Sequence, residues 1–153
     1  FSKTLSASIR CGYIAAPRGW IDGLIDLKIA TSFGGARLSP ELVLTMLKDG
    51  SYRKHMESVR ARLSKAMGAT AARLKPLGLK PLMAEPAGIF LWCRLPDGID
   101  ATDVAHRALA NHVVLAPGNA FSVSQTAGSF LRFNVAQCED ERIFKVLKAA
   151  MRP

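Results

Sequence analysis

Apolar residues recur at steps of three and four through residues 52–75, and this period predicts one long amphipathic helix. Pro76 and Gly78 would end that helix, because proline blocks helical hydrogen bonding and glycine favours the turn that follows. The predicted apolar stripe consists of Met56, Val59, Leu63, Ala66, Thr70 and Leu74. Basic residues lie off this stripe and predict a solvated face, formed by Arg53, Lys54, Arg60, Arg62 and Lys65.

Four other segments have helical features. Residues 19–32 show an irregular helical pattern. Ser39 followed by Pro40 predicts an N-cap and first helical position, with the helix running to about Lys48. Asp100 is expected to cap a helix over residues 101–111. Glu139, Asp140 and Glu141 predict the start of a last helix, because carboxylates are stabilised at a helix N-terminus.

Short apolar runs predict the strands. They cover residues 9–16, 79–84, 88–95, 112–118 and 129–135. Helices followed by strands mixed with helices predict an α+β fold, with an antiparallel or mixed sheet covered by helices. We place a domain boundary near residue 35, so that residues 36–153 form their own core and residues 1–35 belong to a different layer.

Composition narrows the classes of function. The 153 residues are 49% hydrophobic and 22% charged, which is typical of one soluble domain, and no apolar run predicts a membrane span. Three scattered cysteines (Cys11, Cys93 and Cys138) indicate neither a disulfide framework nor a zinc site, so we expect a reducing cytoplasm and no metal. The net charge of +9 is spread along the chain, which makes nucleic-acid binding by this segment a weak hypothesis.

Two charged residues are candidates for chemistry. Lys3 lies among small hydroxyl residues in "FSKTLSASIRCGY", where its amine could attack a carbonyl or simply be solvated in a loop. Arg132 lies inside the apolar segment "SFLRFNV", on the strand face opposite Leu131 and Phe133. Its guanidinium could bind a carboxylate through two parallel hydrogen bonds, or it could lie on a wet sheet face. Gly118, in "APGNAFS", is expected to supply a backbone conformation that larger residues resist.

Five segments together resemble one family. "FSKTLSASIRCGYIAAP", "GSYRKHMESVRARL", "AGIFLWCRLP", "VVLAPGNAFS" and "LRFNVA" are similar, in order and spacing, to fold type I pyridoxal-phosphate enzymes. The similarity is greatest to the aminotransferase-like domains of MocR-type transcriptional regulators, a branch of the GntR family. It implies that residues 36–153 are the small C-terminal domain and that residues 1–35 are a remnant of the large domain with its lysine loop.

The resemblance also implies a role for individual residues. Lys3 matches the catalytic lysine that binds the aldehyde of pyridoxal 5'-phosphate and moves protons. Ser2 and Arg10 match phosphate-binding positions, and Arg132 matches the arginine that binds the α-carboxylate of an amino acid. Residues 6–8, "SAS", depart from the proline-glycine turn that relatives often have, which affects the geometry between Lys3 and Arg10.

The resemblance implies that the chain is the C-terminal fragment of a cytoplasmic, homodimeric regulator. Its effector domain would bind pyridoxal phosphate and an amino-acid or amine ligand, and a preceding winged-helix domain would bind DNA. Further cofactor-binding groups are expected before Phe1, so we expect the fragment alone to bind the cofactor weakly and not to transaminate. One alternative is a fragment of a free-standing aminotransferase for aromatic or 2-aminoadipate-like substrates. The other is a plain α+β interaction domain. We also expect residues 1–35 to be disordered or to contact another chain.

Overall fold

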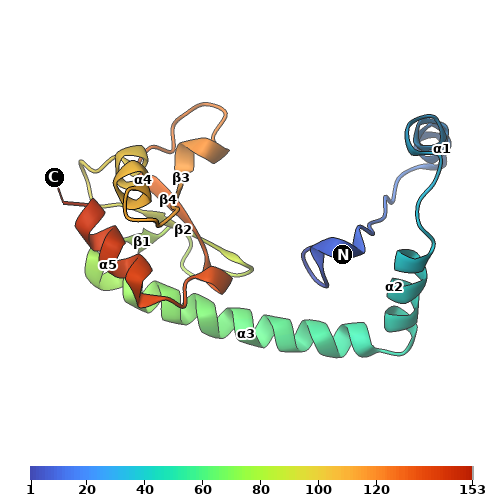
Figure 1. Ribbon diagram of the computed structural model, residues 1–153, viewed down its shortest axis with the longest axis horizontal. Helices are drawn as coiled ribbons and strands as arrows, with labels where there is room; N and C mark the ends of the chain where they lie inside the picture. The colour runs from blue at the N-terminus through green and yellow to red at the C-terminus, as the bar shows by residue number, and fades with distance from the viewer. Residues whose placement is uncertain (153) are drawn as a thin grey trace. The chain divides into compact units, whose positions relative to one another are not determined.

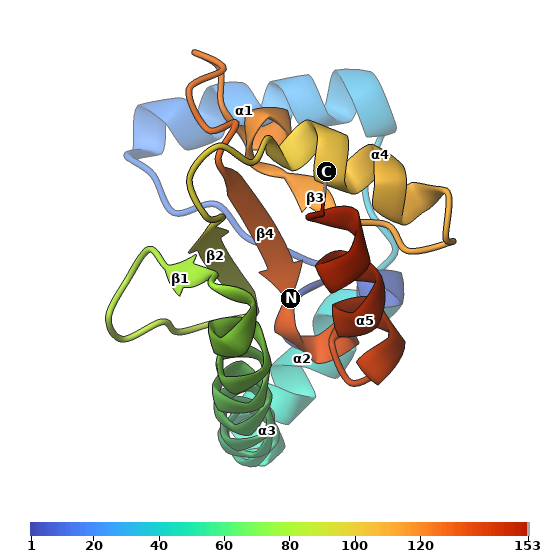
Figure 2. The ribbon, with the colours of Figure 1, turned by 90° about the vertical axis from the view of Figure 1, so that its left-hand side faces the viewer.

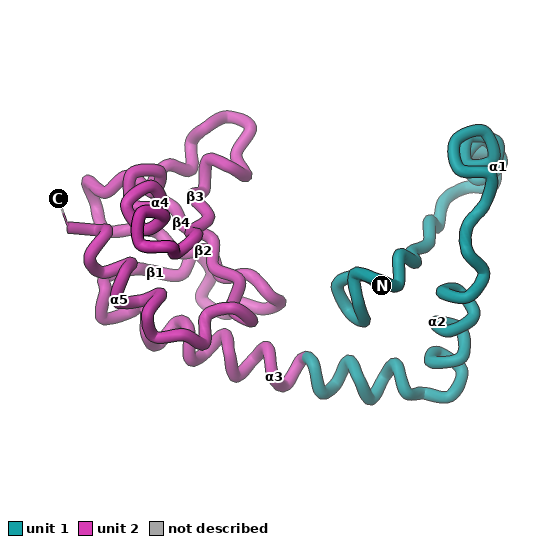
Figure 3. Tube along the Cα trace, in the orientation of Figure 1, with its two compact units in different colours: residues 1–59 teal, residues 60–153 magenta. Residues whose placement is uncertain are grey.

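The computed structural model describes residues 1–152, and the chain divides into two compact units. Unit 1 is Phe1–Val59 and unit 2 is Arg60–Pro153, as Figure 3 shows in two colours. Within the described residues, no helix is both long and apolar enough to cross a bilayer.

Unit 1 consists of short helical segments joined by extended chain (Figure 1). Its elements are η1 (Ala7–Ile9), α1 (Arg18–Ser32), α2 (Leu38–Lys48) and the beginning of α3 (Ser51–Leu74). The irregular helix predicted over residues 19–32 is confirmed as α1, and it ends at Phe33, whose φ of 58° is left-handed. Gly50, with a φ of 77°, separates α2 from α3. The predicted end of α2 at Lys48 is therefore confirmed.

Unit 2 contains a sheet of four strands, in the order β1 (Lys80–Pro81), β2 (Phe90–Arg94), β4 (Phe130–Asn134) and β3 (Ala116–Pro117). Each pair of neighbouring strands is antiparallel (Figure 2). This arrangement confirms the predicted α+β class. The two long strands pair so that Trp92 lies opposite Arg132. The elements after α3 are η2 (Lys75–Leu77), β1 (Lys80–Pro81), β2 (Phe90–Arg94), α4 (Ala101–Leu109), β3 (Ala116–Pro117), η3 (Gly118–Phe121), β4 (Phe130–Asn134), η4 (Val135–Gln137) and α5 (Glu141–Ala150).

The core of unit 2 lies on one face of this sheet. Leu131 and Phe133 of β4 are buried, and the alternate residues Phe130, Arg132 and Asn134 are half-buried. This is the alternation that the sequence predicted. β2 contributes Leu91 and Cys93 to the same cluster. The helices complete it with Met67 and Leu74 from α3, Ala101, Val104 and Ala108 from α4, and Phe144, Leu147 and Ala150 from α5. Burial of this apolar surface is the main force that stabilises the unit.

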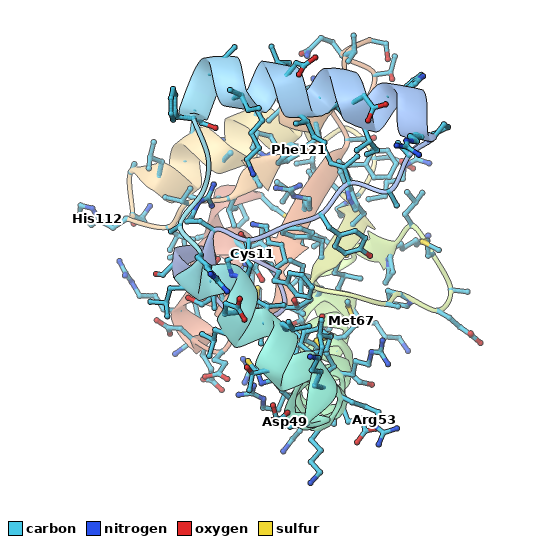
Figure 4. All side chains as sticks on the ribbon, turned by 90° about the vertical axis from the view of Figure 1, so that its right-hand side faces the viewer. Cys11, Asp49, Arg53, Met67, His112 and Phe121 are labelled. Carbon is cyan, nitrogen blue, oxygen red and sulfur yellow. The ribbon has the colours of Figure 1, made fainter. Side chains whose placement is uncertain are left out.

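The predicted stripe and basic face of α3 are both confirmed. Thr70 and Leu74 are buried, and the other stripe residues are half-buried. The five basic residues named above are exposed, and Figure 4 shows Arg53 extending outward from the helix. The basic residues of this segment therefore form a solvated face.

Two local predictions are wrong. Residues 9–16 form no strand, and within residues 1–152 no other segment pairs with them. An extended apolar segment becomes a strand only when a neighbour accepts its backbone hydrogen bonds. Ser39 is not an N-cap either, because α2 begins at Leu38 and its N-cap, Arg37, makes no side-chain cap hydrogen bond. The predicted cap at Asp100 is confirmed, since its carboxylate accepts the backbone N–H groups of Thr102 and Asp103. The predicted start of the last helix is confirmed too, with Asp140 as its N-cap.

Candidate functional site

Three of the four predicted site residues lie together in unit 1. Ser2, Lys3 and Arg10 line one open concavity of about 430 Å³. The chain folds back here because the nitrogen of Phe1 donates a hydrogen bond to the carbonyl oxygen of Cys11 at 2.8 Å. The residues on either side of Lys3 are thereby brought next to the segment that carries Arg10.

Two residues in the first turns of α3 hold the loop that carries Lys3 in place. The Tyr52 hydroxyl lies 3.2 Å from Thr4 Oγ1, and His55 Nε2 lies 2.7 Å from the carbonyl oxygen of Thr4. The ring of Phe1 packs edge-on against Tyr52, with 5.6 Å between the ring centroids. Thr4 is therefore anchored, whereas the neighbouring Lys3 is exposed and forms no ion pair among the described residues.

The "SAS" segment closes its own turn. Ser6 accepts a hydrogen bond from the backbone N–H of Ser8, and η1 ends at Arg10, which adopts a left-handed φ of 46°. Left-handed backbone is uncommon for a residue with a side chain, and such residues are often held in place at functional sites. The turn directs the chain so that Arg10 lines the same concavity as Lys3, although the proline-glycine turn of relatives is absent.

The donor groups in this concavity fit a phosphate-bearing aldehyde. Lys3 is exposed, so a carbonyl compound can reach its amine. The Ser2 hydroxyl and the Arg10 guanidinium are donors of the type that phosphate oxygens accept. The arrangement can therefore hold both ends of such a molecule on one surface of the loop.

Arg132 belongs to unit 2 and lies in the middle of β4, on the face of the sheet that does not contribute to the core. Its guanidinium carbon lies 3.5 Å from the ring centroid of Phe121 and 4.2 Å from that of Phe90. No carboxylate of residues 1–152 forms an ion pair with it. The side chain lines a concavity of about 420 Å³ together with Phe90 and Asn134.

The structure thus refines the two interpretations that the sequence left open for Arg132. The side chain is half-buried on the outer sheet face, between aromatic rings, and its N–H groups have no acidic partner in the described part of the chain. Phe121 was missed by sequence reasoning. The only signal was an aromatic residue three positions after the Pro117–Gly118 turn, and a turn pattern does not reveal what that ring contacts.

Gly118 has a different structural role from the predicted one. Its φ is not among the positive values of the chain, so backbone conformation does not require glycine there. A Cβ atom at this position would instead lie 2.3 Å from the carbonyl oxygen of Ala127 and 3.0 Å from the Cβ of Phe130. Glycine is needed because the turn and β4 approach each other closely.

The two buried cysteines, Cys93 and Cys138, are not reactive thiols. Burial raises the pKa of the Cys93 thiol to about 12, and burial also raises the pKa of Cys138 despite the nearby Arg73. Both thiols are therefore protonated and unreactive at neutral pH. Among residues 1–152, no group of three or more His, Cys, Asp or Glu side chains is arranged to hold a metal ion.

Comparison with known proteins gives one family. The model of the family "Aminotransferase class I and II" matches residues 1–149. The HTH-type transcriptional regulator YdfD of Bacillus subtilis is 28% identical over 148 residues, which are 94% of this chain and 30% of that protein. The 2-aminoadipate transaminase of Thermus thermophilus is 28% identical over 145 residues, which are 94% of this chain and 36% of that protein.

A solved structure agrees with these matches. The α-aminoadipate aminotransferase LysN of Thermus thermophilus, in complex with N-(5'-phosphopyridoxyl)-L-leucine, superposes with a TM-score of 0.82 at 26% identity. The match covers 99% of this chain and 40% of that one. The chain spans about a third of the length of the curated relatives it matches.

Proposed function

Because the chain belongs to the aminotransferase class I and II family, we propose that it forms the C-terminal part of a pyridoxal-phosphate-binding, aminotransferase-like domain. The observation that carries this proposal is the concavity that Ser2, Lys3 and Arg10 share. An amine, a hydroxyl and a guanidinium on one loop match the chemistry of the cofactor's aldehyde and phosphate.

Each residue has a distinct task in the proposed site. The Ser2 hydroxyl and the Arg10 guanidinium donate to the phosphate and so fix the position of the cofactor. The Lys3 amine would hold the aldehyde end of the cofactor, and as a free amine it would carry a proton from and to the α-carbon of the substrate. When bound, pyridoxal phosphate supplies the electron-withdrawing ring that makes this proton labile.

Arg132 is proposed to bind the α-carboxylate of an amino acid. A guanidinium offers two parallel N–H groups that match the two oxygens of a carboxylate. The absence of an acidic partner for Arg132 among residues 1–152 supports the proposal, because its donors remain available. This pairing would hold the substrate by its carboxylate.

The proposal extends to a whole protein in one of two forms. We favour a MocR-type regulator, homodimeric and located in the cytoplasm, in which a winged-helix domain binds DNA and this domain responds to an amino acid. Three relatives named as HTH-type transcriptional regulators, from Bacillus subtilis and Escherichia coli, favour that form. The similarity to a 2-aminoadipate transaminase favours the second form, a free-standing aminotransferase. In either form, residues 1–35 would be part of the large domain, and residues 36–153 would be the small domain.

Covalent trapping tests the site. The complete encoded protein is incubated with pyridoxal phosphate and reduced with borohydride, and the labelled peptide is identified by mass spectrometry. We expect one label per chain on Lys3, loss of that label in Lys3→Ala, and no loss in Lys28→Ala, which removes another exposed lysine of unit 1. A label that is distributed over several lysines, or that persists in Lys3→Ala, would contradict the proposal.

The two forms of the whole protein are separated by their response to amino acids. A regulator changes its affinity for promoter DNA when an amino acid is added, whereas an aminotransferase converts amino acids to oxo acids at a steady rate. Substitution of Arg132 by Lys should abolish either response while the protein stays folded. Loss of folding alone would favour the plain interaction domain.

A further inference from the structure

We propose that Phe121, braced by Trp92, positions the Arg132 guanidinium so that a carboxylate can bind only along its N–H edge. This inference rests on the proposed function, since it assigns a positioning role around the carboxylate-binding residue of the same site. Figure 4 labels Phe121, which belongs to η3, directly after β3.

The distances determine how the guanidinium is oriented. Its carbon lies 3.5 Å from the Phe121 centroid, a separation at which only a stacked arrangement keeps the guanidinium nitrogens clear of the ring. Phe90, at 4.2 Å, belongs to β2 and gives the guanidinium a second aromatic contact. With a face stacked on Phe121, the N–H groups point outward in the plane of the guanidinium. A carboxylate therefore meets them edge-on, which is the geometry of two parallel hydrogen bonds.

Phe121 also contacts a second ring, that of Trp92. The Trp92 ring packs edge-on against it, with 5.7 Å between centroids and 78° between the ring planes. Trp92 lies directly opposite Arg132 in the sheet register, so the same strand pair supplies both the cation and the brace. The result is a cluster in which the sheet fixes Trp92, Trp92 limits the Phe121 ring, and Phe121 limits Arg132.

Hydrogen bonds fix the turn that carries Phe121. Asn119 Oδ1 accepts from the backbone N–H of Ala127 at 2.9 Å. The Gln125 side-chain amide donates to the carbonyl oxygens of Asn119 and Ser122 at 3.0 and 2.9 Å. Contact of Gly118 with Ala127 anchors the base of the same turn. Phe121 is 43% exposed, and hydrogen bonds hold the backbone on either side of it, at Asn119 and Ser122.

The aromatic contacts would also strengthen ion pairing. Rings on the guanidinium displace water from it, and a charge pair gains energy when fewer water molecules screen it. A cation held against an aromatic ring keeps part of its stabilisation without giving up any hydrogen-bond donor. Phe121 should therefore increase affinity for ligands with a carboxylate and have no effect on ligands without one.

A matched pair of probes tests this selectivity. N-(5'-phosphopyridoxyl)-L-alanine carries a carboxylate, and N-(5'-phosphopyridoxyl)ethylamine is the same molecule without it. Both bind without any reaction, and their small side chain avoids assumptions about substrate specificity. Calorimetric titration of the complete encoded protein, free of cofactor, gives the ratio of the two dissociation constants.

The variants distinguish the effect of the aromatic ring at position 121 from the effect of side-chain size. Phe121→Leu keeps an apolar side chain but removes the ring. It should weaken binding of the alanine probe by about 3- to 10-fold and leave binding of the ethylamine probe unchanged. Phe121→Tyr keeps the ring and should keep the ratio. Val123→Ala, at a fully exposed position of the same loop, is the matched control and should also keep it. The NMR signal of Arg132 Nε–Hε should lose part of its ring-current shift in Phe121→Leu only, because Phe90 remains beside the guanidinium.

Each outcome has a defined meaning. An unchanged ratio in Phe121→Leu, or a lost ratio in Phe121→Tyr, overturns the positioning role while the proposed function stands. Equal affinity of the unsubstituted protein for both probes overturns carboxylate binding by Arg132, and the positioning role with it. If Phe121→Leu weakens both probes equally or fails to fold, the ring is structural and the inference is wrong.

Discussion

The two units of this chain differ in how they use their apolar residues. Unit 1 buries a single side chain among its described residues, Val43, although it carries many large apolar residues. Tyr13, Trp20 and Phe33 are 82%, 73% and 92% exposed. In unit 2, buried residues from three helices and the sheet form one continuous cluster. Unit 2 therefore closes a core from its own sequence, and unit 1 does not.

The ends of the helices show the same difference. The helices α4 and α5 of unit 2 are each preceded by an N-cap aspartate whose carboxylate accepts at least one backbone N–H of the first turn. In unit 1, neither α1 nor α2 has a side-chain cap at its N-terminus. Local hydrogen bonds and core packing thus agree with each other in unit 2, which is the consistency expected of a segment that specifies its own structure.

Separate expression of the two parts should give the largest effect. We expect residues 51–153 to unfold in one cooperative thermal transition, because they contain α3 and the whole core of unit 2. Residues 1–50 should show no such transition, because a chain with one buried side chain cannot offset its loss of conformational entropy. Circular dichroism during heating is the measurement. Cooperative unfolding of residues 1–50 would contradict the comparison.

Single truncations of side chains should differ in the same direction. Leu74→Ala removes a fully buried side chain of unit 2 and should lower the free energy of unfolding by about 2–5 kcal/mol. Ile29→Ala removes a side chain that is 53% exposed on α1, and the change should stay within about 0.5 kcal/mol. Urea unfolding followed by circular dichroism measures both. Similar losses for the two variants would show that Ile29 is buried in the native protein.

A smaller loss than that of Leu74→Ala is expected at the cap of α4. Asp100→Ala removes the acceptor for the N–H groups of Asp103 and Thr102 and should cost about 1 kcal/mol at neutral pH. These N–H groups, that of Asp103 foremost, hold the Asp100 pKa below its ordinary value. A lowered folded-state pKa means that the contribution is present above the unfolded pKa of about 3.9 and is lost as pH falls through the folded value.

The pH dependence supplies its own control. The difference in stability between the unsubstituted protein and Asp100→Ala should be constant near neutral pH and shrink below about pH 4. Asp100→Asn keeps an N-cap acceptor without a charge, so its stability should lack this loss at acid pH. Urea unfolding at a series of pH values measures both variants. A difference that stays constant down to pH 2 would show that the carboxylate charge does not contribute.

Sequence patterns predicted unit 2 better than unit 1, for a physical reason. The three- and four-residue period of α3 and the alternation along β4 are local consequences of burial against a core within the same chain. The apolar run at residues 9–16 has the same local pattern as a strand. Pairing, however, depends on a neighbouring segment, and the described chain provides none. Strands β1 and β3 are shorter than predicted, because only two residues of each pair in register with a neighbouring strand.

The candidate site shows a similar limit. The sequence identified Ser2, Lys3, Arg10 and Arg132 by their resemblance to a family, and the structure brings the first three to one concavity. Their roles remain predictions. The Phe121 stack on Arg132 was missed because it joins a turn to a strand, and no period along the chain encodes such a contact. The role assigned to Gly118 was wrong for the same reason, since the restriction comes from Ala127 and not from its own backbone angles.

The crowding at Gly118 has a consequence at the level of the genetic code. A side chain at this position would collide with the carbonyl oxygen of Ala127, so no other amino acid fits without displacing the turn that presents Phe121. All four glycine codons share their first two bases, and every missense change in those two bases introduces a side chain. A point mutation at this codon is therefore either silent or disturbs the geometry around Arg132. Few substitutions of Gly118 would have a mild effect.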